Sequence, residues 1–597
     1  MRDGLYGLFK LDQEFLNNEE RFWLEMENSG SGDNQWQNET AGFIFVDSTP
    51  LKGDTGYVVD AEYVTGFMGD LDNREVLANL LDLPFATSAG QLVWAAIRHF
   101  GESGLNLIEG QWTFWVWDAI KYQLTVAVSR NLRDALYLVS VDGCVALSSS
   151  IRHLQALPWL PKGFDDLGLL LLLGRAPLRS KLDGRTWQRE VISLLPGSIH
   201  SIRLGAHTQS IWAKPLQAEE WHGNFDDAVN EMEMRARRAV RNRIRRHKTI
   251  AVLLSGGMDS SLLAWLAATE LRPDQRLIAI SSVASKHSGI QDERRWIEMV
   301  AKTLGIEVYY VSPDSDKSVY FPSSQHFDTA ESPIHSPRHY LYEKLFAAAY
   351  AAGADAILDG CFGEQSLTRS CVNNSVLQNW RRKISHFLQQ SKRAFRRWIV
   401  ADISDLFHIR LSREKRMILP AGMTKKLPAN GLSGPSSHRQ QAIGFPQGYA
   451  KAALNTEMTS INGLRRLLPF RAPELVSLSA ALPGKFFDRN GQSRVIVRSI
   501  LSKHFPPELS MRTDKKPFCP EHLDLLKRNA AVELLKIELY GSLLAWEWID
   551  KEWLCKALQK ISLDQADVQT RDVAQATCTA LAFLRWQESL RVITKTL

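Results

Sequence analysis

The sequence is poor in the residues that cross-link secreted proteins and in the apolar runs that cross membranes. Its six cysteines are scattered over 597 residues, with no C-x-x-C pair. This spacing excludes a disulfide framework and the usual zinc sites, and favours a reducing compartment. The apolar run 167–173 is far too short to span a bilayer, and no signal peptide follows Met1. We expect a soluble cytoplasmic protein with no membrane partner.

Strong charge of either sign is also missing. The formal net charge is +6, which is mild at this length and does not imply nucleic acid. A chain this long exceeds one hydrophobic core. We predict a β-rich domain over residues 1–215, a polar linker over 216–226 and a second domain over 227–597.

Short β-branched and aromatic runs bounded by turn residues recur in the first region, which is typical of strands. Trp112, Trp115 and Trp117 share one run, where aromatic side chains usually pack in the core. The segments 73–81 and 89–100 are predicted helices. Many short strands with few helices indicate a layered antiparallel domain. The predicted strands are 42–46, 57–60, 111–117, 124–128 and 144–148.

The most specific motif follows an apolar run, 250–254, that predicts a buried parallel strand. The run breaks into Ser255-Gly256-Gly257, and a segment that predicts a helix follows at once. Two glycines let the backbone approach a ligand that a Cβ would block. The N–H groups of the turn and of the helix start then converge on one point. We predict a receptor for phosphate or pyrophosphate.

Asp259 lies just inside this receptor, where a bridging Mg²⁺ most simply explains a carboxylate that faces an anion. Ser260 and Ser261 place hydroxyls beside the same oxygens. The pattern lacks the lysine of the G-x-x-x-x-G-K-[ST] loop. It resembles instead the pyrophosphate loop of enzymes that split ATP between the α and β phosphates.

Strand and helix patterns alternate beyond this turn, which predicts a doubly wound parallel sheet with ligands at the carboxyl ends of its strands. From about residue 361 the pattern is mostly helical. The predicted strands are 276–281, 307–311 and 356–359, and the predicted helices are 259–270, 291–304 and 338–352.

Two basic segments lie outside this pattern. The predicted helix 225–248 ends in cations that we interpret as offsetting the helix dipole. They are Arg241, Arg243, Arg245, Arg246 and Lys248. The segment 380–416 is either a docking surface for an acidic peptide or partner protein, or a solvated helix face. Residues 431–437 are predicted to form a flexible loop over the site.

Several motifs together resemble the asparagine synthetase family over nearly the whole chain. Residues 108–118 (IEGQWTFWVWD) are similar to the family's L-x-G-x-F-A-F-x-x-W-D, and 128–137 (VSRNLRDALY) to A-R-D-x-x-G-x-x-P-L-Y. The resemblance implies an N-terminal Ntn-hydrolase-like αββα sandwich. It also implies a C-terminal adenine nucleotide alpha hydrolase-like (PP-loop ATP pyrophosphatase) parallel sheet with helical additions. Further matching segments are 194–198, 211–215, 469–475, 482–483, 494–498 and 512–518.

One departure from the family bears on function. A working glutaminase of this family has cysteine as residue 2, because the thiolate exposed by loss of Met1 attacks the glutamine amide. Here residue 2 is Arg2, and the first cysteine is Cys144. We therefore expect the N-terminal domain to be a structural remnant that releases no ammonia. The nucleophile is then most simply an amine on the enzyme's own substrate.

Two branches of the family fit an adenylating half without an ammonia source. One is β-lactam synthetase, and the other is the lasso-peptide cyclase, which joins a peptide's N-terminal amine to an Asp or Glu side chain. The segment 358–364 (LDGCFGE) departs from the family's S-G-E-G-S-D-E, as cyclases commonly do. The chain resembles the cyclase more. The implied partners are a precursor peptide, a leader-peptide-binding protein and a leader protease, with no nucleic acid.

The resemblance also implies the ATP site. Glu364 aligns with the family's second metal-binding Asp, so Asp259 and Glu364 are predicted to bridge Mg²⁺, although Glu364 also suits a helix N-terminus. Lys515, with Lys516 as the alternative, is predicted to stabilise the charge on the leaving pyrophosphate. The resemblance implies that Leu254 and Val283 lie beside adenine. It implies that Asp359 and Gly360 contact the nucleotide. The residues implied to bind pyrophosphate and Mg²⁺ are Ser255, Gly256, Gly257, Asp259 and Ser260.

The implied reaction is attack of a substrate carboxylate on ATP, followed by displacement of AMP by the amine, with positioning as the main catalytic effect. Glu364, His335 and His339 are candidate bases, although a solvated loop position is the ordinary fate of each histidine. Three alternatives stay open. They are amidation of a small molecule, by β-lactam closure or with ammonia, a nucleotide-sensing pseudoenzyme, and a tRNA-modifying enzyme that only the basic segment supports.

Overall fold

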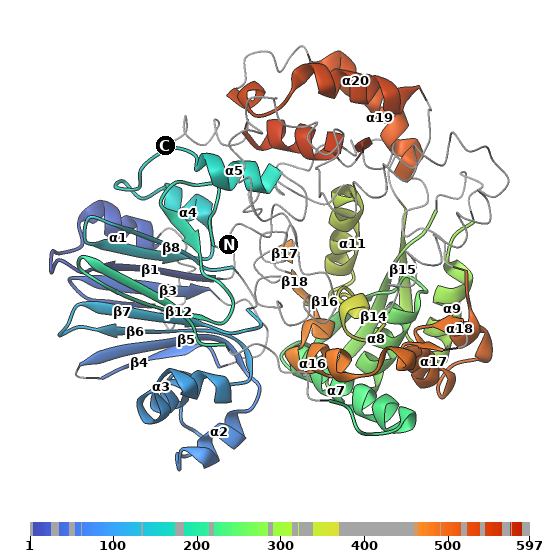
Figure 1. Ribbon diagram of the computed structural model, residues 1–597, viewed down its shortest axis with the longest axis horizontal. Coiled ribbons are helices and arrows are strands. Elements are labelled where there is room, and N and C mark those ends of the chain that lie inside the picture. Colours follow the sequence, from blue (N-terminus) through green and yellow to red (C-terminus); the bar gives the residue numbers. More distant parts are fainter. Residues whose placement is uncertain are drawn as a thin grey trace, which may run out of the picture.

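Two stacked antiparallel sheets and one parallel sheet organise the protein (Figure 1). No helix in the described part of the chain is long and apolar enough to cross a membrane. The computed structural model describes residues 4–25, 35–46, 54–60, 62–132, 135–173, 184–213, 220–284, 291–312, 320, 338–368, 460–461, 464–489, 491–514, 522–537, 544–563, 573–574 and 576–587.

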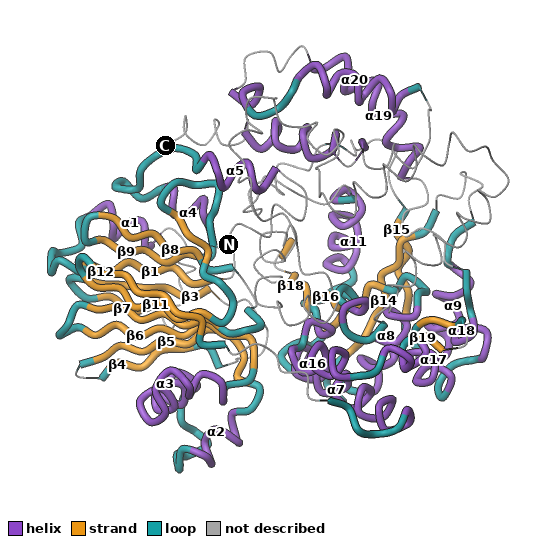
Figure 2. The backbone as a smooth tube through the Cα atoms, viewed as in Figure 1, coloured by secondary structure: helices purple, strands orange, loops and turns teal. Residues whose placement is uncertain are grey.

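Two six-stranded antiparallel sheets lie face to face in the N-terminal region (Figure 2). The first has the order β10 (Val191–Ser193), β8 (Tyr137–Val141), β9 (Cys144–Ser148), β1 (Gly4–Lys10), β3 (Ala41–Val46) and β2 (Gln35–Gln37). The second has the order β12 (Ala206–Ile211), β11 (Ser198–Arg203), β7 (Gln123–Val128), β6 (Gly110–Asp118), β5 (Tyr63–Leu71) and β4 (Gly56–Val59).

Strand β6 shows why the two sheets stack. Trp115 and Trp117 alternate along it with Trp112 and Phe114, and the first pair packs between the sheets. The second pair packs against α3 (Ala89–Phe100) on the outer face, beside α2 (Arg74–Leu80). Helices α1 (Asn18–Glu25), α4 (Ile151–Gln155) and α5 (Asp166–Leu173) pack against the other sheet. The four layers confirm the predicted layered domain, and all three tryptophans are buried as predicted.

A six-stranded sheet forms the second region, in the order β15 (Glu307–Val311), β14 (Arg276–Ser282), β13 (Thr249–Leu253), β16 (Ala356–Leu358), β18 (Leu464–Leu467) and β17 (Ser460–Ile461). All neighbours pair in parallel except β17 with β18. The chain runs from β13 outward through β14 to β15, and then returns to the other side of β13 with β16. The order therefore reverses between β13 and β16, where ligands of such sheets bind.

Alternate residues of β13 face opposite layers. Ile250 and Val252 pack with α7 (Phe225–Ile244), α8 (Met258–Thr269), α9 (Arg294–Leu304), α16 (Pro473–Ala481) and α17 (Val495–Ser502). Ala251 and Leu253 pack with α11 (His339–Ala351) on the other face. Helices on both faces confirm the doubly wound prediction. The predicted elements lie within three residues of their predicted bounds, except that α7 ends four residues early, at Ile244.

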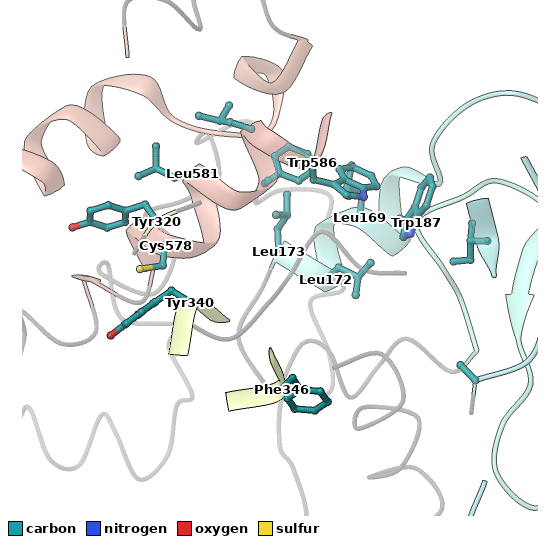
Figure 3. Packing of buried hydrophobic residues seen from close by; sticks show 14 of the residues in the cluster. Leu169, Leu172, Leu173, Trp187, Tyr320, Tyr340, Phe346, Cys578, Leu581 and Trp586 are labelled. Atoms are coloured by element: carbon teal, nitrogen blue, oxygen red, sulfur yellow. The ribbon is translucent and has the colours of Figure 1, made fainter. Parts of the chain in front are cut away.

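The last described helices connect the two regions. Helices α19 (His522–Lys536) and α20 (Lys551–Ser562) lie above the parallel sheet in Figure 1. The helical residues 576–587 share a core with α5. The ring of Trp586 lies 4.8 Å from that of Trp187 and 5.9 Å from that of Phe164 (Figure 3). A segment near the end of the described chain thus completes the outer layer of the N-terminal sandwich.

The cations at the end of α7 form a second contact between the regions. Arg243 ion-pairs with Asp72, Arg245 lies 3.3 Å from Asp72, and Arg246 lies 2.9 Å from Asp70. The side chains of Arg243 and Arg246 are only 7% and 9% exposed. Arg241 and Arg243 lie in the last turn of α7, where compensation of the helix dipole is predicted, and Arg243, Arg245 and Arg246 have a further role. They bind carboxylates at the end of β5, because the N-terminal sandwich packs directly on α7.

The boundaries of the predicted domains stay predictions. Strand β12 ends at Ile211 and α7 begins at Phe225, so the last two residues of the predicted linker, 225 and 226, belong to α7. Asn224 caps α7, because its side chain accepts a hydrogen bond from the amide of Asp227.

Candidate active site

The predicted phosphate turn joins the end of β13 to the start of α8. Gly256 has a φ of +66°, and a Cβ there would lie 2.8 Å from the Cβ of Trp296. The position therefore needs glycine both for its backbone and for space. Gly257 is the N-cap of α8 and has no side chain to cap it, so the first-turn amides can bind an anion. The hydroxyls of Ser255 and Ser260 lie 3.0 Å apart and brace the turn.

Leu254 and Val283 occupy the ends of neighbouring strands, as the adenine prediction requires. The amide of Leu254 donates to the carbonyl of Ile280 at 3.0 Å, and that of Val283 to the carbonyl of Val311 at 2.9 Å. The hydroxyl of Ser281 donates to the Leu254 carbonyl at 2.8 Å. Both predicted side chains are buried. The structure brings them to one edge of the sheet, and their contact with adenine stays a prediction.

The loop after β16 lies directly against the phosphate turn. A Cβ on Gly363 would lie 3.0 Å from Cγ of Asp259, and a Cβ on Gly360 would lie 3.6 Å from the amide nitrogen of Ser260. Glycine at both positions allows the loop to approach the first turn of α8. The two segments that we predicted to share the nucleotide therefore meet at the reversal point of the sheet.

Arg494 joins the two carboxylates predicted to bind metal. Its guanidinium lies 3.6 Å from Oδ2 of Asp259 and 3.7 Å from Oε1 of Glu364. Arg494 has a φ of +62°, a left-handed conformation that is rare outside glycine. Glu364 belongs to the three-residue turn Gly363–Gln365 and its side chain is 74% exposed. Such a short turn has little helix dipole, so the alternative reading of Glu364 as a dipole-bound carboxylate fits poorly.

Asp259 and Glu364 fit Mg²⁺ when a nucleotide is bound. No group of three His, Cys, Asp or Glu side chains within the described ranges is arranged to hold a metal ion. Mg²⁺ commonly takes only one or two carboxylates besides water and substrate phosphates. Because both carboxylates approach one cationic side chain, the space between them favours positive charge. Metal binding itself stays a prediction.

Asp359 is held by a buried ion pair. Its Oδ2 lies 2.6 Å from the Arg466 guanidinium, and its Oδ1 accepts from the amide of Cys361 at 2.9 Å. Burial acts to raise the pKa of Asp359, but Arg466 and Cys361 hold it below its ordinary value. Burial raises the pKa of the Cys361 thiol to about 12, so this thiol is no nucleophile at neutral pH. Asp359 therefore fixes the loop after β16 through its ion pair with Arg466. Gly360, and not Asp359, lies against the first turn of α8.

Arg512 begins a segment that the family resemblance matched, but we assigned this residue no role from the sequence. Its guanidinium donates to the carbonyl of Gly256 and lies 2.7 Å from Oε2 of Glu293. It also donates to the backbone carbonyl of Asp514. The side chain is 3% exposed and stacks 4.5 Å from the ring of Trp296. Arg512 thus fastens the segment that leads to the predicted Lys515 onto the phosphate turn.

Several predicted residues lie outside the described part of the chain. They are Lys515, Lys516, His335, the basic segment 380–416 and the loop 431–437. His339 is described as the first residue of α11 and is 1% exposed. The prediction of a solvated position is wrong for His339, because the first turn of α11 is buried. The neighbouring Tyr340 stacks on His522 at the start of α19, with its hydroxyl 3.0 Å from Nδ1.

The space between the two N-terminal sheets is closed near the start of β1. A cavity lined by Leu5, Met68, Trp112 and Leu136 measures about 10 Å³, which is barely room for one water. Leu5 lies three residues from the position where the family resemblance places a glutaminase nucleophile.

Comparison with known proteins identifies the class. Residues 231–588 match the family model described as asparagine synthase, which is more than half of the chain. The chain belongs to the asparagine synthase family.

Individual relatives are distant. The chain is 24% identical to "Amidase chyE" of Penicillium rubens, over 42% of this chain and 38% of that protein. It is 26% identical to a "Putative asparagine synthetase [glutamine-hydrolyzing]" of Mycobacterium tuberculosis, over 37% of this chain and 35% of that one. The matches thus span well under half of these relatives. A B. subtilis glutamine phosphoribosylpyrophosphate amidotransferase structure covers 54% of this chain and 83% of its own, with 10% identity and a TM-score of 0.24.

Proposed function

We propose that this enzyme closes a macrolactam in a lasso-type precursor peptide. It would adenylate an Asp or Glu side chain of the peptide and join that carbonyl to the peptide's N-terminal amine. The observation that carries the proposal is a phosphate turn with Asp259 and Glu364 beside it, in a chain that has no cysteine before Cys144. The sandwich is then a degenerate amidotransferase-like domain, and the amine must come with the substrate.

The chemistry has two displacements. A carboxylate oxygen attacks the α-phosphorus of ATP, the bond to the β-phosphate oxygen breaks, and pyrophosphate leaves. The amine nitrogen then attacks the acyl carbon, the bond to AMP breaks, and the amine proton passes to a base. When bound, Mg²⁺ would neutralise phosphate charge, and Asp259 and Glu364 would hold it. The turn 255–260 and Lys515 would stabilise the leaving pyrophosphate.

Glu364 is the better candidate base of those described. It is exposed and beside the phosphate turn, whereas His339 is buried. A precursor peptide would be folded against the site before closure, since the chain entropy of the ring must be lost first. A leader-peptide-binding protein and a leader protease would supply that peptide in processed form.

A second candidate is amidation of a small-molecule carboxylate, with ammonia or with an amine of the same molecule as in β-lactam closure. The relative named as a putative asparagine synthetase supports it, since this chain aligns with part of that protein. The two candidates share the adenylating step and differ in the carboxylate.

Exchange of labelled pyrophosphate into ATP tests the proposal. We expect exchange that depends on a precursor peptide with an internal Asp or Glu, and its loss in Asp259→Asn. Asp274→Asn is the matched control, because that carboxylate is 58% exposed. Exchange with aspartate alone would establish the second candidate. Absence of exchange with every carboxylate, despite ATP binding, would refute both and favour a nucleotide sensor.

A further inference from the structure

A cavity of about 270 Å³ lies between the N-terminal sandwich and the synthetase region. Its polar lining from the sandwich side is Asp72, Asn106, Glu109, Ser129, Arg130 and Asn131, and from the other side it is Arg238, Asn242, Arg243 and Glu474. Asp72 and Arg243 pair with each other. The lining contains no residue of the phosphate turn or of the loop 359–364. The cavity is therefore separate from the candidate active site.

The sandwich wall offers polar groups without matching partners. Arg130 donates to Oδ1 of Asn106 at 3.3 Å, and no carboxylate within the described ranges forms an ion pair with it. Asn131 is 6% exposed, and its side-chain oxygen has no hydrogen-bond partner in the described part of the chain. A buried amide without a partner is unfavourable. This wall is suited to a ligand that brings both an anion and a donor.

The opposite wall offers a carboxylate. Glu474 lies 4.0 Å from Nε of Arg238, which is the outer limit of an ion pair. Burial raises the pKa of Glu474, and the opposing effect of Arg238 and Arg243 is too weak to offset the loss of water around its charged form. A cationic group in the cavity would restore that lost stabilisation. The cavity thus presents the Arg130 guanidinium, which forms no ion pair within the described ranges, together with the Glu474 carboxylate on its other side.

We propose that this cavity binds a free α-amino acid. Its carboxylate would bind Arg130, and its ammonium would donate to Asn131 and Glu474. The volume lies just below the ~300–1,000 Å³ of pockets for drug-sized ligands, so it suits a small metabolite better than a peptide. Because the walls belong to both regions, the ligand would bridge them. The amino acid would then report metabolic state to the synthetase region through the interface.

Calorimetric titration of the full chain with each of the twenty amino acids tests this site. We expect at least one to bind, with the dissociation constant raised roughly tenfold or more in Arg130→Met, because a charge-assisted hydrogen bond is lost. Glu474→Gln should also weaken amino acids while leaving acetate unaffected. Arg98→Met is the matched control, since Arg98 is exposed on α3.

Three results would overturn the proposal. They are no binding of any amino acid at millimolar concentration, acetate binding as tightly as the amino acids, and binding that Arg130→Met leaves unchanged. If Arg130→Met does not fold, the nearly isosteric Asn131→Leu replaces it. It removes the oxygen that would accept from the ammonium, so it should weaken binding of the amino acid, and equal affinity would count against the site. None of these results depends on which carboxylate the ATP site activates.

Discussion

Replacing Arg512 by methionine should loosen the phosphate turn. The substitution keeps the length of the side chain and removes the cation that contacts the Gly256 carbonyl and Glu293. Both members of this ion pair are buried, at 3% and 7% exposure. Loss of one partner of a buried pair costs about 3–5 kcal/mol. Loss of stacking on Trp296 adds about 0.5–2 kcal/mol. Most of the cost arises because Glu293 stays buried after its cation is gone.

Hydrogen exchange of amides in β13 and α8 would measure this effect locally. Arg512→Met should lower their opening free energy by at least about 3 kcal/mol. Combination with Glu293→Gln should recover part of it, because the buried charge is removed as well. Pyrophosphate exchange should fall by ~10²–10³, since the segment leading to Lys515 loses its anchor.

A surface pair provides the control. Arg276 and Glu307 lie 2.7 Å apart, but their side chains are 56% and 55% exposed. Arg276→Met should therefore cost only about 0–1 kcal/mol. The reasoning is refuted if Arg512→Met costs no more than this control, or if the double variant with Glu293→Gln is additive.

Three further substitutions test other parts of the structure. Burial lowers the pKa of His153 to about 4 from 6.5, so its contribution of roughly 3 kcal/mol is present above pH 6.5 and is lost towards pH 4. His153→Gln should flatten thermal stability over that range, and an unchanged slope would contradict this. Asp359→Asn should cost about 3–5 kcal/mol in urea unfolding, because Arg466 stays buried without its carboxylate. Since the pKa of Asp359 is lowered, the wild type should lose this stabilisation only below about pH 4, and the variant should show no such loss. Gly256→Ala should abolish ATP binding in calorimetry, whereas Gly305→Ala, with a similar φ of +67° and open space, should cost only about 1–2 kcal/mol and leave binding intact.

The spacing of apolar residues predicted those strands and helices in which apolar positions repeat regularly along the segment. Strand β6 and helix α3 appear within a residue of their predicted bounds, because their apolar residues alternate or repeat regularly. Strand β5 did not, since its glycines suggest a turn. Gly66 is required there because the Trp115 indole occupies the space of a Cβ, 1.9 Å away. Only the cross-strand neighbour explains that glycine.

The charged strand β18 escaped prediction for a related reason. Its sequence LRRL lacks an apolar run, yet Arg465 is 6% exposed and Arg466 binds Asp359. A charged side chain inside a sheet is stabilised here by a partner that lies far away in the sequence, as Asp359 does for Arg466. The phosphate turn was predictable because its glycines, serines and Asp259 act within a few residues. Arg512 was not, since it reaches Gly256 across 256 positions of sequence.

The shared core of α5 and residues 576–587 sets an order of events during synthesis. Helix α5 (DLGLLLLL) leaves the ribosome about 400 residues before Trp586, which covers it in the native protein. At a synthesis rate of ~5–20 residues per second, the leucines of α5 stay exposed for roughly 20–80 s before residues 576–587 can pack on them. The apolar face of α5 on the nascent sandwich is therefore exposed, and prone to aggregation, during most of translation. Chaperone occupancy on ribosome-bound chains should begin near residue 173 and end once the last helix emerges.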